Sequence, residues 1–175
     1  IEGQLITKTL KLKPLIINNC IVSDIAQDVL KMVVVNRYQQ APIAKAFIKN
    51  FGLQHGAIAS TVAHDSHNII CVGINDVMIC KAVNALIACG GGIAVVNERT
   101  EHVMPLPVAG LMSNASAETI AKQYAALDKE AKALGSPLAA PFMTLSFMAL
   151  LVIPQLKLSD KGLFDGDKFE FVDLF

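Results

Sequence analysis

The stretch Asn68–Val96, which reads NIICVGINDVMICKAVNALIACGGGIAVV, decides the fold because strand, helix and strand patterns follow one another within it. Residues 68–73 form a short apolar run with β-branched side chains, which predicts a buried strand. Residues 92–96, GIAVV, predict a second strand of the same kind. A strand, a helix and a strand in this order form a crossover unit, which we expect to be right-handed with its two strands parallel.

The helix between these strands is predicted from its cap and from its apolar spacing. Asn75 or Asp76 can accept a hydrogen bond from the first unpaired backbone N–H groups. The apolar side chains follow the i, i+4, i+7, i+8 pattern of one helix face, at Ile79, Val83, Leu86 and Ile87. Glycines 90–92 then end the helix and precede a strand, whereas a phosphate-binding loop runs from a strand into a helix. The glycine run therefore predicts a tight turn.

Upstream of this unit the pattern is mostly that of strands. Alternation or apolar runs predict strands in residues 4–12, 30–36, 43–52 and 56–62. Residues 38–42, from Tyr38 to Pro42, predict a turn.

Downstream, a second helix is the clearest feature. Ser116 can cap it, Glu118 complements the helix dipole, and Gly135 ends it. Its predicted buried face consists of Ile120, Tyr124, Leu127, Ala131 and Leu134.

The segments on either side of this helix are less regular. Prolines at 105 and 107 make residues 103–113 an extended edge or loop segment. Residues 141–154 are long enough for a helix but lie between prolines, and the pattern assigns no element there. Residues 168–175 alternate Phe169, Phe171 and Leu174, which predicts a final strand. Strands and helices interleave along the whole chain. We therefore predict one domain, residues 1–175, of mixed α/β or α+β class with a mixed sheet and flanking helices.

Composition excludes several classes of function. Of the 175 residues 53% are hydrophobic and only 17% charged, and the formal net charge is +0. A surface so poor in charge fits a domain partly covered by another domain or subunit. The absence of a basic stripe argues against nucleic acid or a membrane surface as a partner, and no apolar run is long enough to span a bilayer.

The cysteines and the first residues bear on the compartment. Cysteines 20, 71, 80 and 89 form no C-x-x-C pair, which predicts reduced, buried thiols in a cytoplasmic protein. The chain opens with IEGQLITK, without Met or a secretory leader, so we expect it to be a piece of a longer polypeptide.

The motif Ala63–Asn68, AHDSHN, places five polar or ionisable side chains between two predicted strands. His64 and His67 could ligate a metal, but such sites need three or four ligands, so no complete metal site is predicted. The motif could instead form the polar wall of a pocket, where His and Asp can transfer protons. It could equally be a turn in which Asp65, Ser66 and Asn68 bond their own backbone. The residues alone leave pocket and turn open.

Several separate motifs together resemble one known family. They are FGLQHGAIASTVAHDSHNIICVGINDVMICKAVNALIACGGGIAVV (51–96), PLPVAGLMS (105–113), LAAPFMTLSFMALLVIPQLKLSDKGLFD (138–165) and FEFV (169–172). In this order they resemble the C-terminal domain of bacterial adenine deaminases of the amidohydrolase superfamily, and the resemblance runs from about Gly3 to the end of the chain. This sequence departs from the family pattern in RYQQAPIAK (37–45), in the stretch after Asn75-Asp76, and at Gln155, where the family has a carboxylate.

The resemblance implies hydrolysis of adenine to hypoxanthine and ammonia in purine salvage or catabolism. It implies a manganese or iron centre in a (β/α)₈ barrel that precedes this domain, so that this chain alone binds no complete metal centre and is inactive. We expect His64, Asp65 and His67 to line the pocket or shuttle protons, and Ser66 and Asn68 to contact the substrate. The expected partners are adenine, the chain's own barrel domain and further copies in a homo-oligomer. The alternatives are a non-catalytic oligomerisation or ligand-binding module, and a related amidohydrolase that acts on another base.

Overall fold

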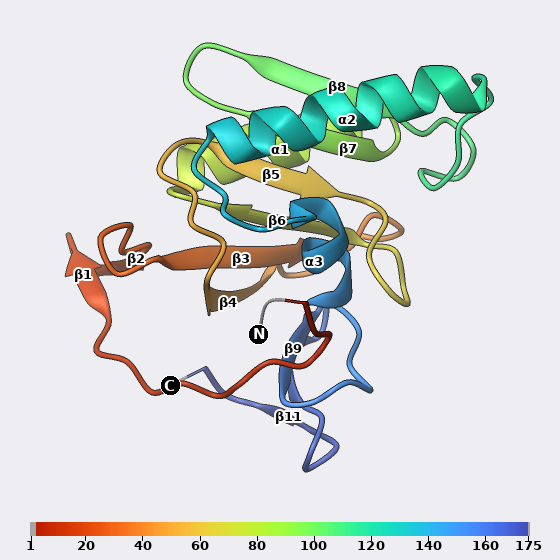
Figure 1. Ribbon diagram of the computed structural model, residues 1–175. Coiled ribbons are helices and arrows are strands. Elements are labelled where there is room, and N and C mark those ends of the chain that lie inside the picture. The colour runs from red at the N-terminus through yellow and green to blue at the C-terminus, as the bar shows by residue number, and fades with distance from the viewer. Residues whose placement is uncertain (1–2, 175) are drawn as a thin grey trace.

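A six-stranded antiparallel sheet forms the centre of the computed structural model, which describes residues 3–174 (Figure 1). In spatial order its strands are β4 (Ala44–Lys49), β3 (Val29–Val35), β6 (Ile69–Gly73), β5 (Ala57–Ser60), β7 (Gly92–Val96) and β8 (Glu101–Pro105). The α+β class is confirmed. Each of β3 to β7 lies inside or within one residue of a predicted strand, and β8 is an edge strand, as the prolines at 105 and 107 predicted.

The predicted crossover connects β6 to β7 through α1 (Asp76–Ala88). Both strands pair antiparallel with β5, so they run parallel to each other, but β5 lies between them and every neighbouring pair within residues 3–174 is antiparallel. The reason is the short loop from β5 to β6, since strands joined by a short connection must run in opposite directions. The handedness of the crossover stays a prediction.

The cap and the face of α1 follow the sequence closely. The Asn75 side chain accepts a hydrogen bond from the Met78 backbone N–H at 2.9 Å. Ile79 and Leu86 are buried against the sheet, but Ile87 is 57% exposed. Eight residues at about 100° each rotate Ile87 by roughly 80° from Ile79, which carries it off the buried face.

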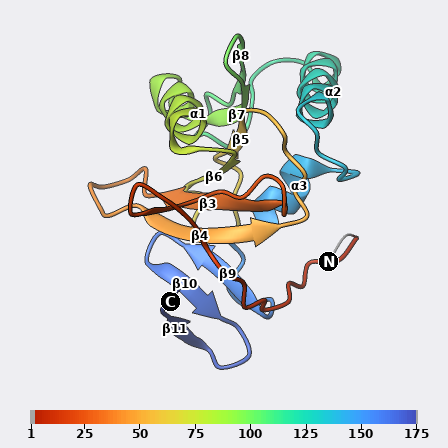
Figure 2. The ribbon, with the colours of Figure 1, turned by 90° about the vertical axis from the view of Figure 1, so that its left-hand side faces the viewer.

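Helices cover both faces of the sheet, as Figure 2 shows with α1 and α2 on opposite sides. Leu30, Met32 and Val34 of β3 pack with α2 (Ala117–Ala133) and α3 (Pro141–Phe147), whereas Val33 packs with α1. This alternation follows from the two-residue period of a strand. Because neither face meets water, the central strands β5 and β6 are buried at every position.

The second predicted helix, α2, is confirmed together with its cap. Ser116 accepts a hydrogen bond from the Thr119 N–H at 3.3 Å. The predicted face is buried at Leu127, Ala131 and Leu134 and partly buried at Ile120 and Tyr124. The unassigned stretch 141–154 contains α3, which begins with Pro141 in its first turn and ends after seven residues.

The structure differs from the predictions near the N-terminus. Residues 4–12 form no strand, and a hairpin follows them instead, made of β1 (Leu15–Ile17) and β2 (Cys20–Val22). Asn18 and Asn19 join the two strands with positive φ angles of 49° and 60°. Asparagine tolerates this conformation, and hairpin turns of two residues require it. The loose alternation in residues 4–12 has no strand beside it to complete a ladder, which is why that prediction was wrong.

A second, three-stranded antiparallel sheet closes the chain. Its strands are β9 (Leu156–Ser159), β10 (Gly162–Asp165) and β11 (Glu170–Val172), and only β11 was predicted. Phe169 is 71% exposed and has a φ of 58°, so it lies outside the strand that its alternation with Phe171 predicted.

The thiols are more exposed than the sequence predicted. All four cysteines are free, and Cys71 is buried in β6, which raises the pKa of its thiol. Cys20 in the hairpin and Cys80 on α1 are exposed, because neither faces the core that its apolar neighbours fill. No helix within residues 3–174 combines the length and the hydropathy that crossing a bilayer demands.

Lys157 is the one fully buried lysine among residues 3–174, and it gives a prediction for stability. Its residue surface is 1% exposed, and its ammonium donates a hydrogen bond to the Leu5 carbonyl. Burial lowers the pKa of Lys157 to about 8. Below pH 8 the folded and unfolded chains are both protonated, so the desolvation cost is present in full. Between pH 8 and about 10.5 only the folded chain loses the proton, so stability rises with pH relative to a chain without the ammonium.

We therefore expect the stability difference between Lys157→Met and the parent chain to change by on the order of 3 kcal/mol from pH 7 to pH 10.5. Met keeps the length of the side chain and removes its charge. Urea unfolding of both proteins at each pH measures the difference. The titrations of Cys71 and Tyr124 occur in both proteins and therefore cancel. A difference that does not vary with pH would show that the Lys157 ammonium is not desolvated.

Candidate functional site

The AHDSHN motif connects β5 to β6 and forms a turn there. A turn was one of the two alternatives that the sequence left undecided. The His67 N–H donates to the Ala63 carbonyl at 2.7 Å, and His67 has a φ of 51°. The turn is therefore closed by its backbone. The Asp65 carboxylate makes no hydrogen bond or ion pair within residues 3–174, unlike in the self-bonded turn considered from the sequence.

Asn68 and Ser66 hold this turn in place. Asn68 is 3% exposed, and its Oδ1 accepts a hydrogen bond from the Arg37 N–H at 3.2 Å. Its Nδ2 donates to Ser66 Oγ at 3.3 Å. Both ends of the Asn68 amide are thus engaged inside the protein, whereas the exposed Ser66 keeps its own O–H for donation.

Arg37 clamps the turn from the end of β3. Its Nε donates to the His67 carbonyl at 2.7 Å, and its Nη2 donates to the Ala109 carbonyl at 2.5 Å. The guanidinium also lies 4.8 Å from the centre of the Tyr38 ring, whose hydroxyl donates to the Ser66 carbonyl at 3.1 Å. Three separate segments of the chain are joined by this one side chain.

Sequence reasoning missed both Arg37 and Tyr38. The available signal was a cation followed by an aromatic residue directly after the buried run of β3. The close approach of Arg37 to the loop at residue 110 also needs a glycine. A Cβ at Gly110 would lie 2.5 Å from Arg37 Nη1, and Gly110 has a φ of 72°.

His64 is held from the other side by α3. Its backbone N–H donates to the Ser146 carbonyl at 3.1 Å, and its ring lies 4.9 Å from the Phe147 ring, measured between centroids. The ring of His67 lies 5.6 Å away in an edge arrangement. The ring nitrogens of His64 make no hydrogen bond within residues 3–174, so this imidazole and the Asp65 carboxylate are the groups left for chemistry.

His67 is partly buried. Its Nδ1 is buried and has no hydrogen-bond partner within the described chain. Burial lowers the pKa of His67, and the nearby His64 and Arg37 lower it further, whereas Asp65 acts in the opposite direction. The ring is therefore neutral at neutral pH, when it can carry a proton on one nitrogen and accept one on the other.

The described residues do not supply a metal centre. Within residues 3–174 no group of three or more His, Cys, Asp or Glu side chains lies close enough together to hold an ion. The two remaining histidines, His55 and His102, lie outside the motif. His102 pairs with Glu130 between β8 and α2, and His55 is exposed after β4. His64 and His67 alone fall short of the three or four ligands that zinc or iron sites use.

One cavity lies beside this turn, and a larger cavity lies away from it. A cavity of about 410 Å³ adjoins the clamp and is lined by Arg37, Tyr38, Ile87 and Gly91 among others. A larger cavity of about 750 Å³ lies between residues 7–15 and the strands β3, β4 and β9, and no residue of 61–68 lines it. The larger hollow is therefore separate from the motif.

Arg37→Lys should loosen the turn while keeping the charge. Lysine cannot donate to two carbonyls in a fixed fork, so the His67 or the Ala109 carbonyl loses its partner, at a cost of about 1–3 kcal/mol. Hydrogen exchange should become faster in residues 64–68 and in residues 108–112. Arg99→Lys, in an exposed turn, is the matched control and should leave both segments unchanged. Equal exchange in the parent and in Arg37→Lys would show that Arg37 does not hold the turn.

Comparisons with known proteins agree on one family. The family model described as adenine deaminase C-terminal domain matches residues 4–170. The adenine deaminase of Methanosarcina mazei is 55% identical over 174 residues, which are 99% of this chain and 31% of that protein. Those of Sulfurovum sp. and Salinibacter ruber are 58% and 55% identical over 85% and 88% of this chain, and 28% of each protein is covered. The chain thus spans about a third of the length of the relatives it matches. It belongs to the adenine deaminase C-terminal domain family.

Proposed function

We propose that this chain is the C-terminal domain, residues 1–175, of an enzyme that hydrolyses adenine to hypoxanthine and ammonia. The observation that carries the proposal is the similarity over 99% of the chain to a protein named adenine deaminase. The remaining polypeptide of the enzyme is proposed to be a barrel domain that precedes this one. The whole protein is then a cytoplasmic homo-oligomer that serves purine salvage or catabolism.

The metal belongs to that barrel in this proposal. A manganese or iron centre there would supply the activated water for attack on the ring. The described residues of this chain hold no cluster that could bind it. Their contribution must come from positioning, proton transfer and exclusion of water.

His64 and Asp65 suit proton transfer in such a reaction. Hydrolytic deamination takes up water and releases ammonia, so protons must move from the water oxygen to the leaving nitrogen. An imidazole and a carboxylate without partners within residues 3–174 can carry such protons at an interface. The neutral His67 ring, 5.6 Å from the His64 ring, can accept a proton from it or orient it.

The substrate contacts fall unequally on Ser66 and Asn68. Ser66 is exposed and retains a donor, which suits a contact with a ring nitrogen of adenine. The Asn68 amide is occupied by Arg37 and Ser66, so we propose that it acts by fixing the turn.

Ammonia release by the full-length protein tests the proposal. We expect release from adenine when manganese or iron is present, loss of activity on chelation, and no release by this chain alone. Release from guanine or cytosine instead would indicate a related amidohydrolase with another substrate. No release from any base by a metal-loaded protein would contradict the enzyme and favour a non-catalytic module for oligomerisation or ligand binding.

A further inference from the structure

Large apolar side chains are concentrated on the surface of one short segment. We call residues 10–17 the apolar strap. Its large side chains are between 39% and 58% exposed, and they are Leu10, Leu12, Leu15, Ile16 and Ile17. Val77 and Ile87, exposed on α1, are ten residues apart, and single exposed apolar residues of this kind are normal for a protein surface. A contiguous run of this kind marks an interaction surface.

Within residues 3–174, hydrogen bonds attach the strap to the domain only at its two ends. Just before it, the Thr7 N–H donates to the Pro154 carbonyl at 3.0 Å and the Thr9 N–H to Gln155 Oε1 at 2.7 Å. At its other end, β1 pairs with β2. Residues 10–14 make no hydrogen bond within residues 3–174. The N–H groups of residues 10–13 and the C=O groups of residues 10–14 are therefore open to solvent or to a partner.

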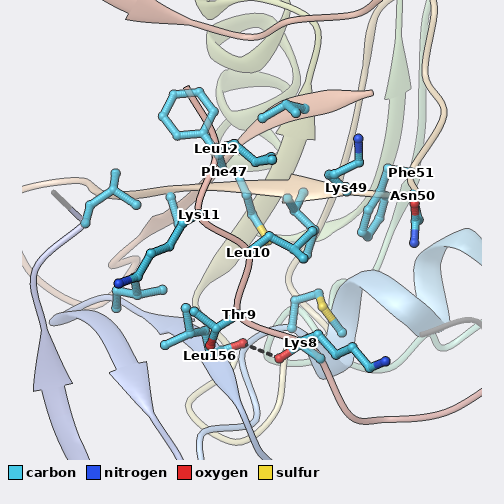
Figure 3. A pocket seen from close by; sticks show the side chains of 18 of the residues that line it. Lys8, Thr9, Leu10, Lys11, Leu12, Phe47, Lys49, Asn50, Phe51 and Leu156 are labelled. Carbon is cyan, nitrogen blue, oxygen red and sulfur yellow. Dashed lines mark hydrogen bonds between the residues drawn. The ribbon is translucent and has the colours of Figure 1, made fainter. Parts of the chain in front are cut away.

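A hollow lies behind the strap. The cavity of about 750 Å³ is lined by Leu10 and Leu12 on one side and by Phe47, Phe51 and Leu156 among others on the far sides. Figure 3 shows the strap crossing β4, with Leu10 and Leu12 near Phe47 and Phe51. Protein interiors leave few voids larger than a water molecule, so an apolar hollow of this size is a place for inserted side chains.

The charged residues around the strap indicate what kind of surface could bind there. Lys8, Lys11 and Lys13 alternate with the leucines and have no carboxylate partner within residues 3–174. Three carboxylates, those of Asp24, Asp165 and Asp173, also line the hollow, against six lysines. An occupant therefore needs apolar side chains for the strap and hollow and carboxylates beside the strap lysines. The chain covers only 31% of its Methanosarcina mazei relative and matches a C-terminal domain, so most of that polypeptide lies outside this structure and precedes it.

We propose that the apolar strap and the hollow behind it form the docking surface for the barrel domain that precedes this chain. The face of the barrel that docks here carries apolar side chains within a rim of Asp and Glu. This inference rests on the proposed placement of the chain after a barrel, but it does not depend on the reaction that the barrel catalyses.

Hydrogen exchange of the full-length protein tests the docking directly. We expect residues 10–13 to exchange at least 10-fold more slowly than an unstructured peptide, because the docked barrel covers them. The double variant Leu12→Glu and Ile16→Glu places charges at positions that are exposed in the isolated domain. It should speed exchange at least 10-fold both in the strap and in an apolar, acid-rimmed surface of the barrel. Val77→Glu, at a position 70% exposed on α1, is the matched control and should change neither.

Three results would overturn the proposal. Residues 10–13 could exchange as fast as free peptide in the parent protein. The double variant could leave barrel exchange unchanged. The molecular mass of the double variant, measured by light scattering, could fall while hydrogen exchange in the barrel stays constant. This result would show that a second copy of the chain occupies the hollow. Slow exchange in β5 and β6 verifies that the variant is folded. Because no readout is enzymatic, a protein that does not deaminate adenine still tests the docking.

Discussion

Gly56→Ala should lower the free energy of unfolding by more than ~3 kcal/mol, whereas Gly90→Ala should cost only about 1 kcal/mol. Both glycines have a left-handed backbone, with φ of 63° at Gly56 and 75° at Gly90. A Cβ at Gly56 would lie 1.9 Å from the Val96 carbonyl oxygen, but a Cβ at Gly90 has nothing within 4 Å. The pair therefore separates the cost of the conformation from the cost of the contact.

The contact costs much stability because neither Gly56 nor Val96 can move to relieve it. Val96 ends the buried strand β7, and the Gly56 carbonyl accepts a hydrogen bond from the Ile74 N–H at 3.0 Å on the opposite side. Relief of the clash must therefore open the ladder between β5 and β7. Urea unfolding of the two variants and the parent measures both losses on one scale. Equal losses for the two variants would mean that β5 shifts freely, contrary to the packing described.

His64→Ala and Asp65→Ala in the full-length protein should each lower kcat/KM for adenine by about 100-fold or more, as expected for groups that transfer protons. Neither functional group has a hydrogen-bond partner within residues 3–174, so their removal leaves no buried polar group unpaired. Stability should accordingly change little. The control is His55→Ala, which removes an exposed histidine after β4 and should leave kcat/KM at the parent value.

The pH profile separates proton transfer from a structural role. The pKa of His67 lies below its ordinary value of 6.5, so if catalysis needs the neutral His67 ring, kcat/KM should fall on the acid side only below about pH 6.5. His64 is one of the groups that lower the pKa of His67, so His64→Ala should move that limb to higher pH, whereas a packing defect would only scale the whole profile. If both variants kept the kcat/KM of the parent, the turn would have no part in catalysis.

The central elements were predictable because their signals are local. The side chain of Asn75 caps α1 and that of Ser116 caps α2, and both helices show an apolar face at the expected spacing. The strands β6 and β7 are continuous apolar runs and β3 is one except at Lys31, which is typical of strands covered on both faces. In contrast, β1 and β9 have only three and four residues, too few to show a period.

The site was predictable only in its position along the chain. That the motif joins two strands follows from its apolar flanks. The contacts that give it shape come from far away in the sequence, since Arg37 is 30 residues from His67 and 72 from Ala109. No periodicity reports such contacts. For the same reason the sequence did not reveal that the Asn68 amide is engaged within the fold.

The short helix α3 has contacts on two sides whose consequence is thermodynamic. Thr144 and Met148, in and just after α3, line the hollow behind the strap, and Ser146 and Phe147 hold His64. Whatever enters the hollow touches the same rigid element that positions the imidazole. The occupancy of the hollow and the position of the His64 imidazole are then thermodynamically linked, and such linkage acts equally in both directions. Under the proposed docking, a small molecule that orders the His64 turn should strengthen the association of this domain with the barrel by the same factor by which that association strengthens its own binding.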